Sequence, residues 1–281
     1  MIGAEVKNKR AATLKLLTDL SVSATDYARI NEYALWPDED AYDASFEASI
    51  NELRLFRVTQ CNPILLNVTQ AFRRPKDIAK SFLIVANFSF RYFIIGNQSP
   101  GNLERVSNTI AVKIRKGKVT KPKELAEELQ AISPDATFRA DFSLVEFSKA
   151  RARIARYTLA KLNNHLSKNA NGAEQVTNPD AKQVNLEHVL PQNPTQIWRA
   201  GFEKQVAPED YIYKLGNLTL LTNKVNRDVA DKSFADKKKE AFSKSALVLN
   251  QTVRRFSKWS NVEIEKRQQE LAKVALELWN L

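Results

Sequence analysis

The chain has 281 residues, 43% of them hydrophobic and 27% charged, which is the composition of an ordinary globular protein. Its single cysteine, Cys61, excludes an internal disulfide framework and a multi-cysteine zinc site, and it favours a reduced, cytoplasmic setting. The formal net charge of +11 indicates a polyanionic partner such as nucleic acid. The first ten residues lack the apolar segment of a secretory signal, so we expect no export.

Helical patterns dominate the first half of the chain. Glycine is scarce, at 7 residues, and helix-forming residues are common, which predicts a mainly α-helical protein. Apolar spacing and proline positions predict helices over residues 9–35, 45–58, 63–72, 77–96, 102–117 and 121–133. The run FLIVANFSFRYFIIG (82–96) is too short to cross a bilayer and contains Arg91. We therefore predict that it is a buried core helix and that the protein does not associate with membranes.

Two basic segments are candidate phosphate contacts. Residues 113–123, KIRKGKVTKPK, hold six basic side chains and no acidic one, which predicts a solvated turn, with phosphate contact as the alternative. A predicted turn, SPDATF (133–138), precedes a helix near residues 146–168. This helix carries a basic stripe of Lys149, Arg153 and Arg156. We weigh a solvated face slightly above direct DNA contact for this stripe.

A polar, turn-rich segment, NANGAEQVTNPDAK (169–182), is typical of a linker. It predicts a helical domain over 1–168 and a second domain over 183–281. In the second domain, KQVNLEHVL (182–190) and KLGNLTLLT (214–222) have the patterns of two short strands. A helical region with an Asx-rich start follows, and amphipathic segments over 247–256 and 261–281 close the chain. Trp198 and Trp259 are expected to be packing residues.

One of the chain's two histidines, His188, follows Glu187 at the end of the first predicted strand. Consecutive strand residues point to opposite faces, and Pro191 favours a strand end here. One side chain of the pair can therefore bind a metal while the other serves a water molecule. Phosphodiester hydrolysis needs a base for water and a hard divalent cation for the phosphate charge. Taken alone, however, such a histidine is more often structural.

Four sequence elements, in this order, resemble the HNH-like (ββα-metal) C-terminal nuclease domain of GmrSD-type type IV restriction endonucleases and of related phosphorothioation-dependent antiphage proteins. They are Glu187-His188-Val189-Leu190-Pro191, Gly216-Asn217-Leu218-Thr219-Leu220-Leu221, Asn226, and Phe234 with Lys237. The RYTL of residues 156–159 and the tail around Trp259 and Arg267 extend the resemblance over nearly the whole chain. The resemblance implies a mainly α fold: an N-terminal helical bundle, a ββα-metal nuclease unit, and closing C-terminal helices.

The resemblance also implies roles for individual residues. His188 resembles the general base, and Glu187 and Asn226 resemble the ligands of Mg²⁺ or Mn²⁺. Asn217 resembles the residue that fixes the His188 ring and the loop between the strands. Asn223 is a competing metal ligand whose spacing fits less well. The candidate nucleic-acid contacts are Lys237, Arg227, Lys224, Arg153 and Arg156.

This pattern implies a metal-dependent DNA endonuclease or nickase of an antiphage restriction system, acting on double-stranded DNA that is foreign or modified. The family commonly adds a nucleotide-hydrolysing domain with a DGQQR-like motif. Neither that motif nor a Walker A loop occurs here, so we expect the domain on another subunit or in a longer chain. The alternatives are a catalytically decayed helical module that binds DNA or a partner, and an RNase or toxin-like nuclease.

Overall fold

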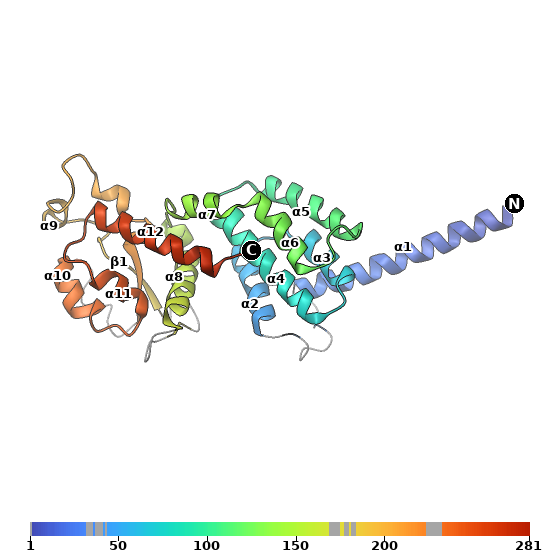
Figure 1. The fold of residues 1–281 in the computed structure, drawn as a ribbon, viewed down its shortest axis with the longest axis horizontal. Helices are drawn as coiled ribbons and strands as arrows, with labels where there is room; N and C mark the ends of the chain where they lie inside the picture. The colour runs from blue at the N-terminus through green and yellow to red at the C-terminus, as the bar shows by residue number, and fades with distance from the viewer. Residues whose placement is uncertain are drawn as a thin grey trace. The chain divides into compact units, whose positions relative to one another are not determined.

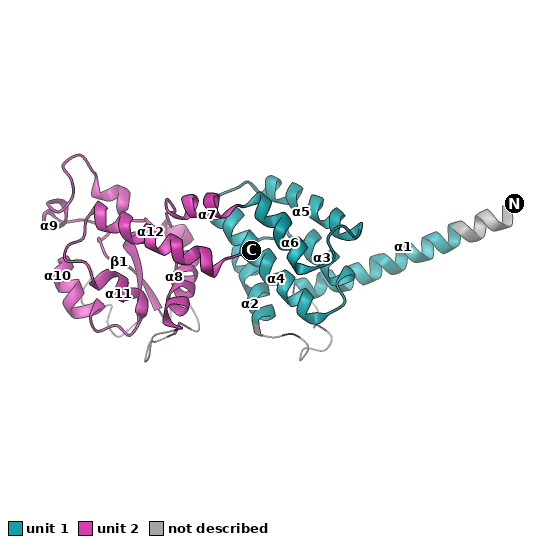
Figure 2. Cartoon of the chain, in the orientation of Figure 1, with its two compact units in different colours: residues 1–133, 281 teal, residues 134–280 magenta. Residues whose placement is uncertain are grey.

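The computed structural model describes residues 2–31, 36, 42, 44–168, 175–176, 180, 184–222 and 232–281. Within these residues helices predominate and two strands form a single sheet, which confirms the predicted mainly α class. Contacts divide the chain into two compact units (Figure 2). Unit 1 comprises residues 1–133 and Leu281, and unit 2 comprises residues 134–280.

Unit 1 is helical, and its helices agree with the segments predicted from apolar spacing. Its elements are α1 (Ile2–Ile30), α2 (Ala44–Phe56), α3 (Asn62–Ala71), α4 (Pro75–Ser89), the π-helix η2 (Phe90–Ile95), α5 (Pro100–Arg115) and α6 (Pro122–Ile132). Proline stands in the first turn of α3, α4, α5 and α6, where its missing N–H leaves no helical hydrogen bond unmade. Local sequence therefore sets where most of these helices begin.

The core helix of unit 1 is formed by α4 and η2 together. The segment Pro75–Ile95 is long and apolar enough to cross a membrane, but 78% of its most apolar window is buried inside the protein. Arg91 within it is 1% exposed, and its Nη2 donates a hydrogen bond to the Ser133 carbonyl at 2.6 Å. These observations are what the predicted buried core helix requires.

Helix α1 lies largely outside the core of unit 1 (Figure 1). Leu14, Leu16, Leu17 and Leu20 are each more than half exposed, whereas Asp26 and Ile30, near the end of the helix, are buried. The apolar spacing thus predicts the helix correctly, but most of its apolar residues contribute little to the core.

Unit 2 combines short helices with one hairpin. Its elements are α7 (Asp135–Phe142), η3 (Lys149–Arg151), α8 (Ala152–Ser167), β1 (Val184–His188), α9 (Gln196–Arg199), η4 (Pro208–Tyr211), η5 (Leu215–Asn217), β2 (Leu218–Thr222), α10 (Phe234–Lys237), the π-helix η6 (Lys238–Phe242), α11 (Val248–Arg254) and α12 (Asn261–Leu278).

The predicted linker, residues 169–182, falls inside unit 2 rather than between the units. The reason is that α8 packs against the strands, α11 and α12. Asn163 on α8 accepts a hydrogen bond from the Leu249 N–H at 3.1 Å, and Trp279 Nε1 donates to the Tyr157 hydroxyl at 3.4 Å. Helix α8 is therefore part of the second unit, although the sequence pattern assigned it to the first.

Residues 135–142 form helix α7, so the turn predicted over SPDATF is wrong. Phe138 and Phe142 stand one helical turn apart, are buried, and pack edge to face with ring centroids 5.7 Å apart. Helix α7 packs on α12, and the Phe142 ring lies 6.1 Å from that of Trp279. Burial of this aromatic pair outweighs the turn preference of Ser-Pro-Asp.

The hairpin of β1 and β2 separates two environments (Figure 1). The strands are antiparallel, with Glu187 opposite Thr219 and His188 opposite Leu218. Directly opposed residues share a face of the sheet, and successive residues alternate between faces. Glu187 and Thr219 therefore point toward α10 and α11, with which they hydrogen-bond, while His188 points toward the start of α8.

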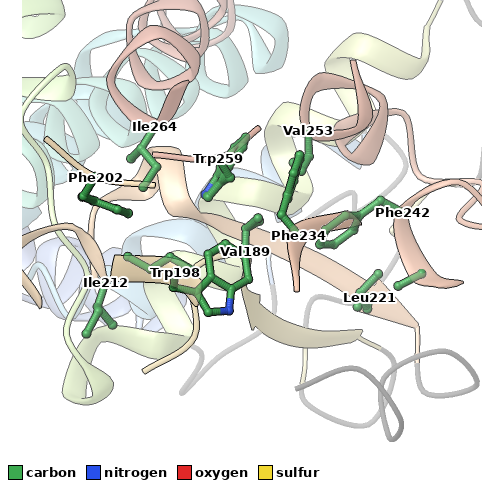
Figure 3. Packing of buried hydrophobic residues seen from close by; sticks show 12 residues of the cluster. Val189, Trp198, Phe202, Ile212, Leu221, Phe234, Phe242, Val253, Trp259 and Ile264 are labelled. Atoms are coloured by element: carbon green, nitrogen blue, oxygen red, sulfur yellow. The ribbon is translucent and has the colours of Figure 1, made fainter. Parts of the chain in front are cut away.

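A hydrophobic core packs around the loop that follows β1 (Figure 3). Val189 and Leu190 lie in it, together with Trp198 and Trp259, which confirms that both tryptophans are packing residues. The Phe234 and Trp259 rings stack at 5.4 Å. This core holds the chain immediately after His188 in place from several elements of unit 2.

Candidate functional site

The site forms where β1 ends. His188 is its last residue, and the chain then turns into the buried core through Val189 and Leu190. The His188 side chain lines a pocket of about 320 Å³. The other lining residues are Phe147, Ser148, Lys149, Ala152, Leu186, Gln192 and Tyr213. The pocket therefore combines aromatic walls with hydroxyl, amide, imidazole and ammonium groups, and none of these residues is acidic.

The His188 ring is held at one nitrogen and by one aromatic neighbour. Gln192 Nε2 lies 3.5 Å from Nδ1, and the Tyr213 ring packs edge-on with centroids 5.7 Å apart. The other nitrogen, Nε2, is buried and has no hydrogen-bond partner among the described residues. A buried ring nitrogen without a protein partner is a position where a substrate or water could bind.

The surroundings of His188 favour its neutral form. Burial, followed by the positive charges of Lys237 and Lys149, lowers the pKa of the imidazole from its ordinary value to about 4. Near pH 7 the ring is therefore uncharged and can accept a proton. The same two cations favour an anionic ligand beside the ring.

Glu187 faces the opposite side of the hairpin and is paired with a lysine. Lys237 Nζ donates hydrogen bonds to Glu187 Oε1 at 2.7 Å and to the His188 carbonyl at 2.8 Å. The Lys237 side chain is 0% exposed and lies over the Trp198 ring. This burial disagrees with the prediction that Lys237 contacts phosphate, because an ammonium without exposed surface cannot reach a duplex. Lys237 instead connects α10 to the end of β1 through these hydrogen bonds.

Asn217 fixes the loop after His188. Its Oδ1 accepts hydrogen bonds from the Leu190 N–H at 2.7 Å and from Trp259 Nε1 at 3.0 Å. Its Nδ2 donates to the carbonyls of Leu190 and Ile212, both at 3.0 Å. These bonds reach the loop main chain, whereas the His188 ring contacts Gln192 and Tyr213. The described hydrogen bonds of Asn217 thus fix the loop and do not involve the imidazole.

Helix α12 hydrogen-bonds to the turn that carries Asn217. Arg267 Nη1 donates to the carbonyls of Gly216 at 2.7 Å and Leu218 at 2.8 Å, and Gln268 Oε1 accepts from the Gly216 N–H at 2.9 Å. Arg267 is fully buried, and this burial lowers its pKa to about 9. Sequence inspection noted Arg267 only as part of a tail and missed Gln268, because no local pattern marks a helix that binds a turn so far upstream.

The predicted nucleic-acid contacts fall in different places. Lys149 lines the His188 pocket, Arg153 is exposed on α8, and Arg156 is half-buried on the same helix. The remaining predicted residues, Lys224, Asn226 and Arg227, as well as Asn223, lie outside the described residues. The structure therefore brings His188 and Lys149 together, and it places Glu187 and Lys237 across the hairpin from them.

The described donors do not by themselves fit a divalent cation. Within the described part of the chain, no three His, Cys, Asp or Glu side chains lie together. One oxygen of Glu187, the expected ligand, already accepts from Lys237. A hard cation normally binds several oxygen ligands. We therefore assign no step to a metal from this geometry.

Unit 2 has two distinguishing features. One is a short antiparallel pair of strands packed among helices, and the other is a histidine at the end of the first strand that lines an open pocket. Residues 132–274 match the C-terminal domain of GmrSD restriction endonucleases. The match covers just over half of the 281 residues, and the chain belongs to this family. It carries a restriction endonuclease domain, and thus a nuclease domain that acts on DNA.

The matched residues coincide with unit 2 almost completely. The resemblance was expected to extend over nearly the whole chain, but the match begins at residue 132 and leaves out the helices of unit 1. A comparison with curated proteins found no match.

Proposed function

We propose that unit 2 hydrolyses phosphodiester bonds of double-stranded DNA, as an HNH-type nuclease, with His188 as the general base. The observation that carries the proposal is that His188 lines an open pocket while its buried Nε2 has no hydrogen-bond partner among the described residues. In the proposed reaction, Nε2 takes a proton from a water molecule. The water oxygen then forms a bond to phosphorus as the bond to the leaving sugar oxygen breaks; that oxygen departs with the bonding electron pair and takes a proton from solvent.

The electrostatics of the pocket suit this role once a phosphate is bound. A base works best when its pKa lies near the working pH, and His188 without substrate lies well below it, at about 4. A phosphate anion beside the ring would favour the charged imidazolium and raise that pKa. Substrate binding would therefore make His188 a stronger base. Without substrate the imidazole is neutral near pH 7, so it can accept a proton.

Mg²⁺ or Mn²⁺ remains the proposed cofactor because the family resemblance implies it, with Glu187 and Asn226 as proposed ligands. We further propose that foreign or modified DNA is the target in antiphage defence, and that nucleotide hydrolysis resides on another domain or subunit. A cytoplasmic location agrees with the single cysteine, a buried thiol.

A second candidate is a DNA- or partner-binding module without activity. The observation that favours it is the pairing of Glu187 with Lys237, which occupies an expected metal ligand. A plasmid-cleavage assay separates the two candidates, and an RNA substrate assayed in parallel tests the RNase alternative.

We expect the wild-type protein to nick supercoiled plasmid with Mg²⁺ or Mn²⁺ but not with EDTA. His188→Ala should lower the rate about 100-fold or more, because loss of a general base typically costs that much. His165→Ala is the matched control, since His165 is the only other histidine and pairs with Glu277 at 3.2 Å on the surface. Equal rates for wild type and His188→Ala would remove His188 as the base. Absence of cleavage of both DNA and RNA would favour the binding module.

A further inference from the structure

We propose that Lys149 binds the phosphate on which His188 acts, and thereby positions it for hydrolysis. This inference rests on the proposed function of unit 2. Lys149 begins η3 and lines the same pocket as His188, although all of α8 and the predicted linker separate it from β1 in the sequence. The sequence pattern places Lys149 in the basic stripe of the helix predicted near residues 146–168, for which a solvated face is weighed slightly above direct DNA contact.

The backbone before Lys149 is anchored to the segment that leads into β2. Phe147 N–H donates to the Tyr213 carbonyl at 2.8 Å, and Leu215 N–H donates to the Val145 carbonyl at 3.2 Å. The Phe147 side chain is 1% exposed. These contacts hold the start of η3 beside the pocket. Lys149 is therefore presented by an ordered backbone and not by a loose surface loop.

The charge of Lys149 is available to a ligand. Its side chain is exposed, and within the described part of the chain it makes no ion pair or hydrogen bond with another residue. Lys237, the other cation that acts on His188, is buried and paired with Glu187. The described pocket lining contains no carboxylate that would neutralise Lys149. An exposed cation in such a pocket suits a phosphate, which accepts charge-assisted hydrogen bonds.

The positions of the two groups support a shared ligand. Lys149 and His188 line the same pocket, so the charge of Lys149 acts within the site. His188 lines the same pocket, and its buried Nε2 has no hydrogen-bond partner within the described part of the chain. A phosphate held by Lys149 would thus lie in the pocket that the His188 side chain lines. Arg153 and Arg156, by contrast, do not line the pocket.

The test compares wild type with Lys149→Ala, Lys149→Arg and Lys273→Ala. Lys273 is an exposed lysine on α12 that does not line the pocket, so its loss removes the same charge elsewhere. Single-turnover nicking of plasmid and the affinity for a short fluorescent duplex are measured at several salt concentrations. Melting temperatures show whether each variant is folded; we expect them to be unchanged because both side chains are exposed.

We expect Lys149→Ala to lower the single-turnover rate about 10- to 100-fold, with partial recovery in Lys149→Arg and no change in Lys273→Ala. The slope of log affinity against log salt should fall by about one for Lys149→Ala. A wild-type rate in folded Lys149→Ala would overturn the inference while leaving His188 in place. If the wild type nicks but His188→Ala nicks equally, the proposed function fails first. If nothing nicks, an unchanged salt slope in Lys149→Ala still overturns the phosphate contact.

Discussion

At the scale of single residues, the environment of His188 decides its charge. The ring is partly buried, lies near two lysines and packs edge-on against Tyr213, and all its described neighbours in the pocket are neutral or positive. Glu187 is adjacent in sequence but points to the other face and is neutralised by Lys237. Because strand residues alternate between faces, the Glu187 carboxylate lies beside a lysine while the His188 imidazole lines a pocket without acidic residues.

We expect the His188 imidazole to remain neutral down to about pH 5 in the absence of divalent metal, because its pKa is about 4. Imidazole NMR signals recorded across a pH series would show this, and His165→Gln assigns the His188 resonance, since the chain has two histidines. A midpoint near the ordinary value of ~6.5 would contradict the structure.

The same shift links stability to pH. Because the folded pKa lies below the unfolded value, the unfolded state binds more protons between about pH 6.5 and 4. The contribution of neutral His188 to the free energy of unfolding is complete above about pH 6.5 and is lost as the pH falls toward 4. It amounts to at most about 3 kcal/mol, and to less where solvent screens the exposed part of the ring.

At the scale of elements, single buried contacts join distant segments around the hairpin. Lys237 of α10 joins the end of β1 through Glu187, and Asn250 of α11 accepts from Thr219 of β2 at 2.6 Å. Arg267 and Gln268 of α12 bind the turn before β2. The hairpin is too short to be stable alone, so these contacts position the site.

Lys237→Met should destabilise unit 2 by about 3–5 kcal/mol, because it leaves the Glu187 carboxylate buried without its cation. The double variant Glu187→Gln with Lys237→Met should recover much of this loss, since no unpaired charge remains. Urea denaturation of the single and double variants measures both effects. Additive losses in the double variant would show that the two side chains are not coupled.

At the scale of the whole molecule, each unit has its own buried core, and the family match coincides with unit 2. Changes in the contacts between α12 and η5 should therefore act mainly within unit 2. Gly216 offers a direct test, because a Cβ there would lie 2.3 Å from the Ile264 carbonyl oxygen and 2.9 Å from Gln268 Cβ.

Gly216→Ala should cost about 1–3 kcal/mol or more, because the backbone of α12 must move to admit the methyl group. Hydrogen exchange followed by mass spectrometry should show faster exchange in peptides of β2 and α12 and unchanged exchange in α4. Gly101→Ala is the control, since no atom lies within 4 Å of a Cβ built there. Equal effects of the two substitutions would argue against the close approach of α12.

Local patterns in the sequence were enough to predict most helices, both strands and the end of β1 near Pro191. Apolar spacing and first-turn prolines act within a few residues, and strand alternation places Glu187 and His188 on opposite faces. The turn expected at 133–138 failed because Phe138 and Phe142 gain more from burial than the local turn preference provides. The downstream Gly216-Asn217 motif also identified the loop-fixing residue.

The sequence by itself determined the mainly helical class, the hairpin and the histidine at its edge, because these depend on periodicity and short motifs. Only the tertiary structure decided which side chains meet there. Lys237 reaches Glu187 from 50 residues away, and Lys149 reaches the His188 pocket from before α8. Such pairings depend on which faces pack together, and the free energy that selects them comes from burial of surfaces far apart in the chain.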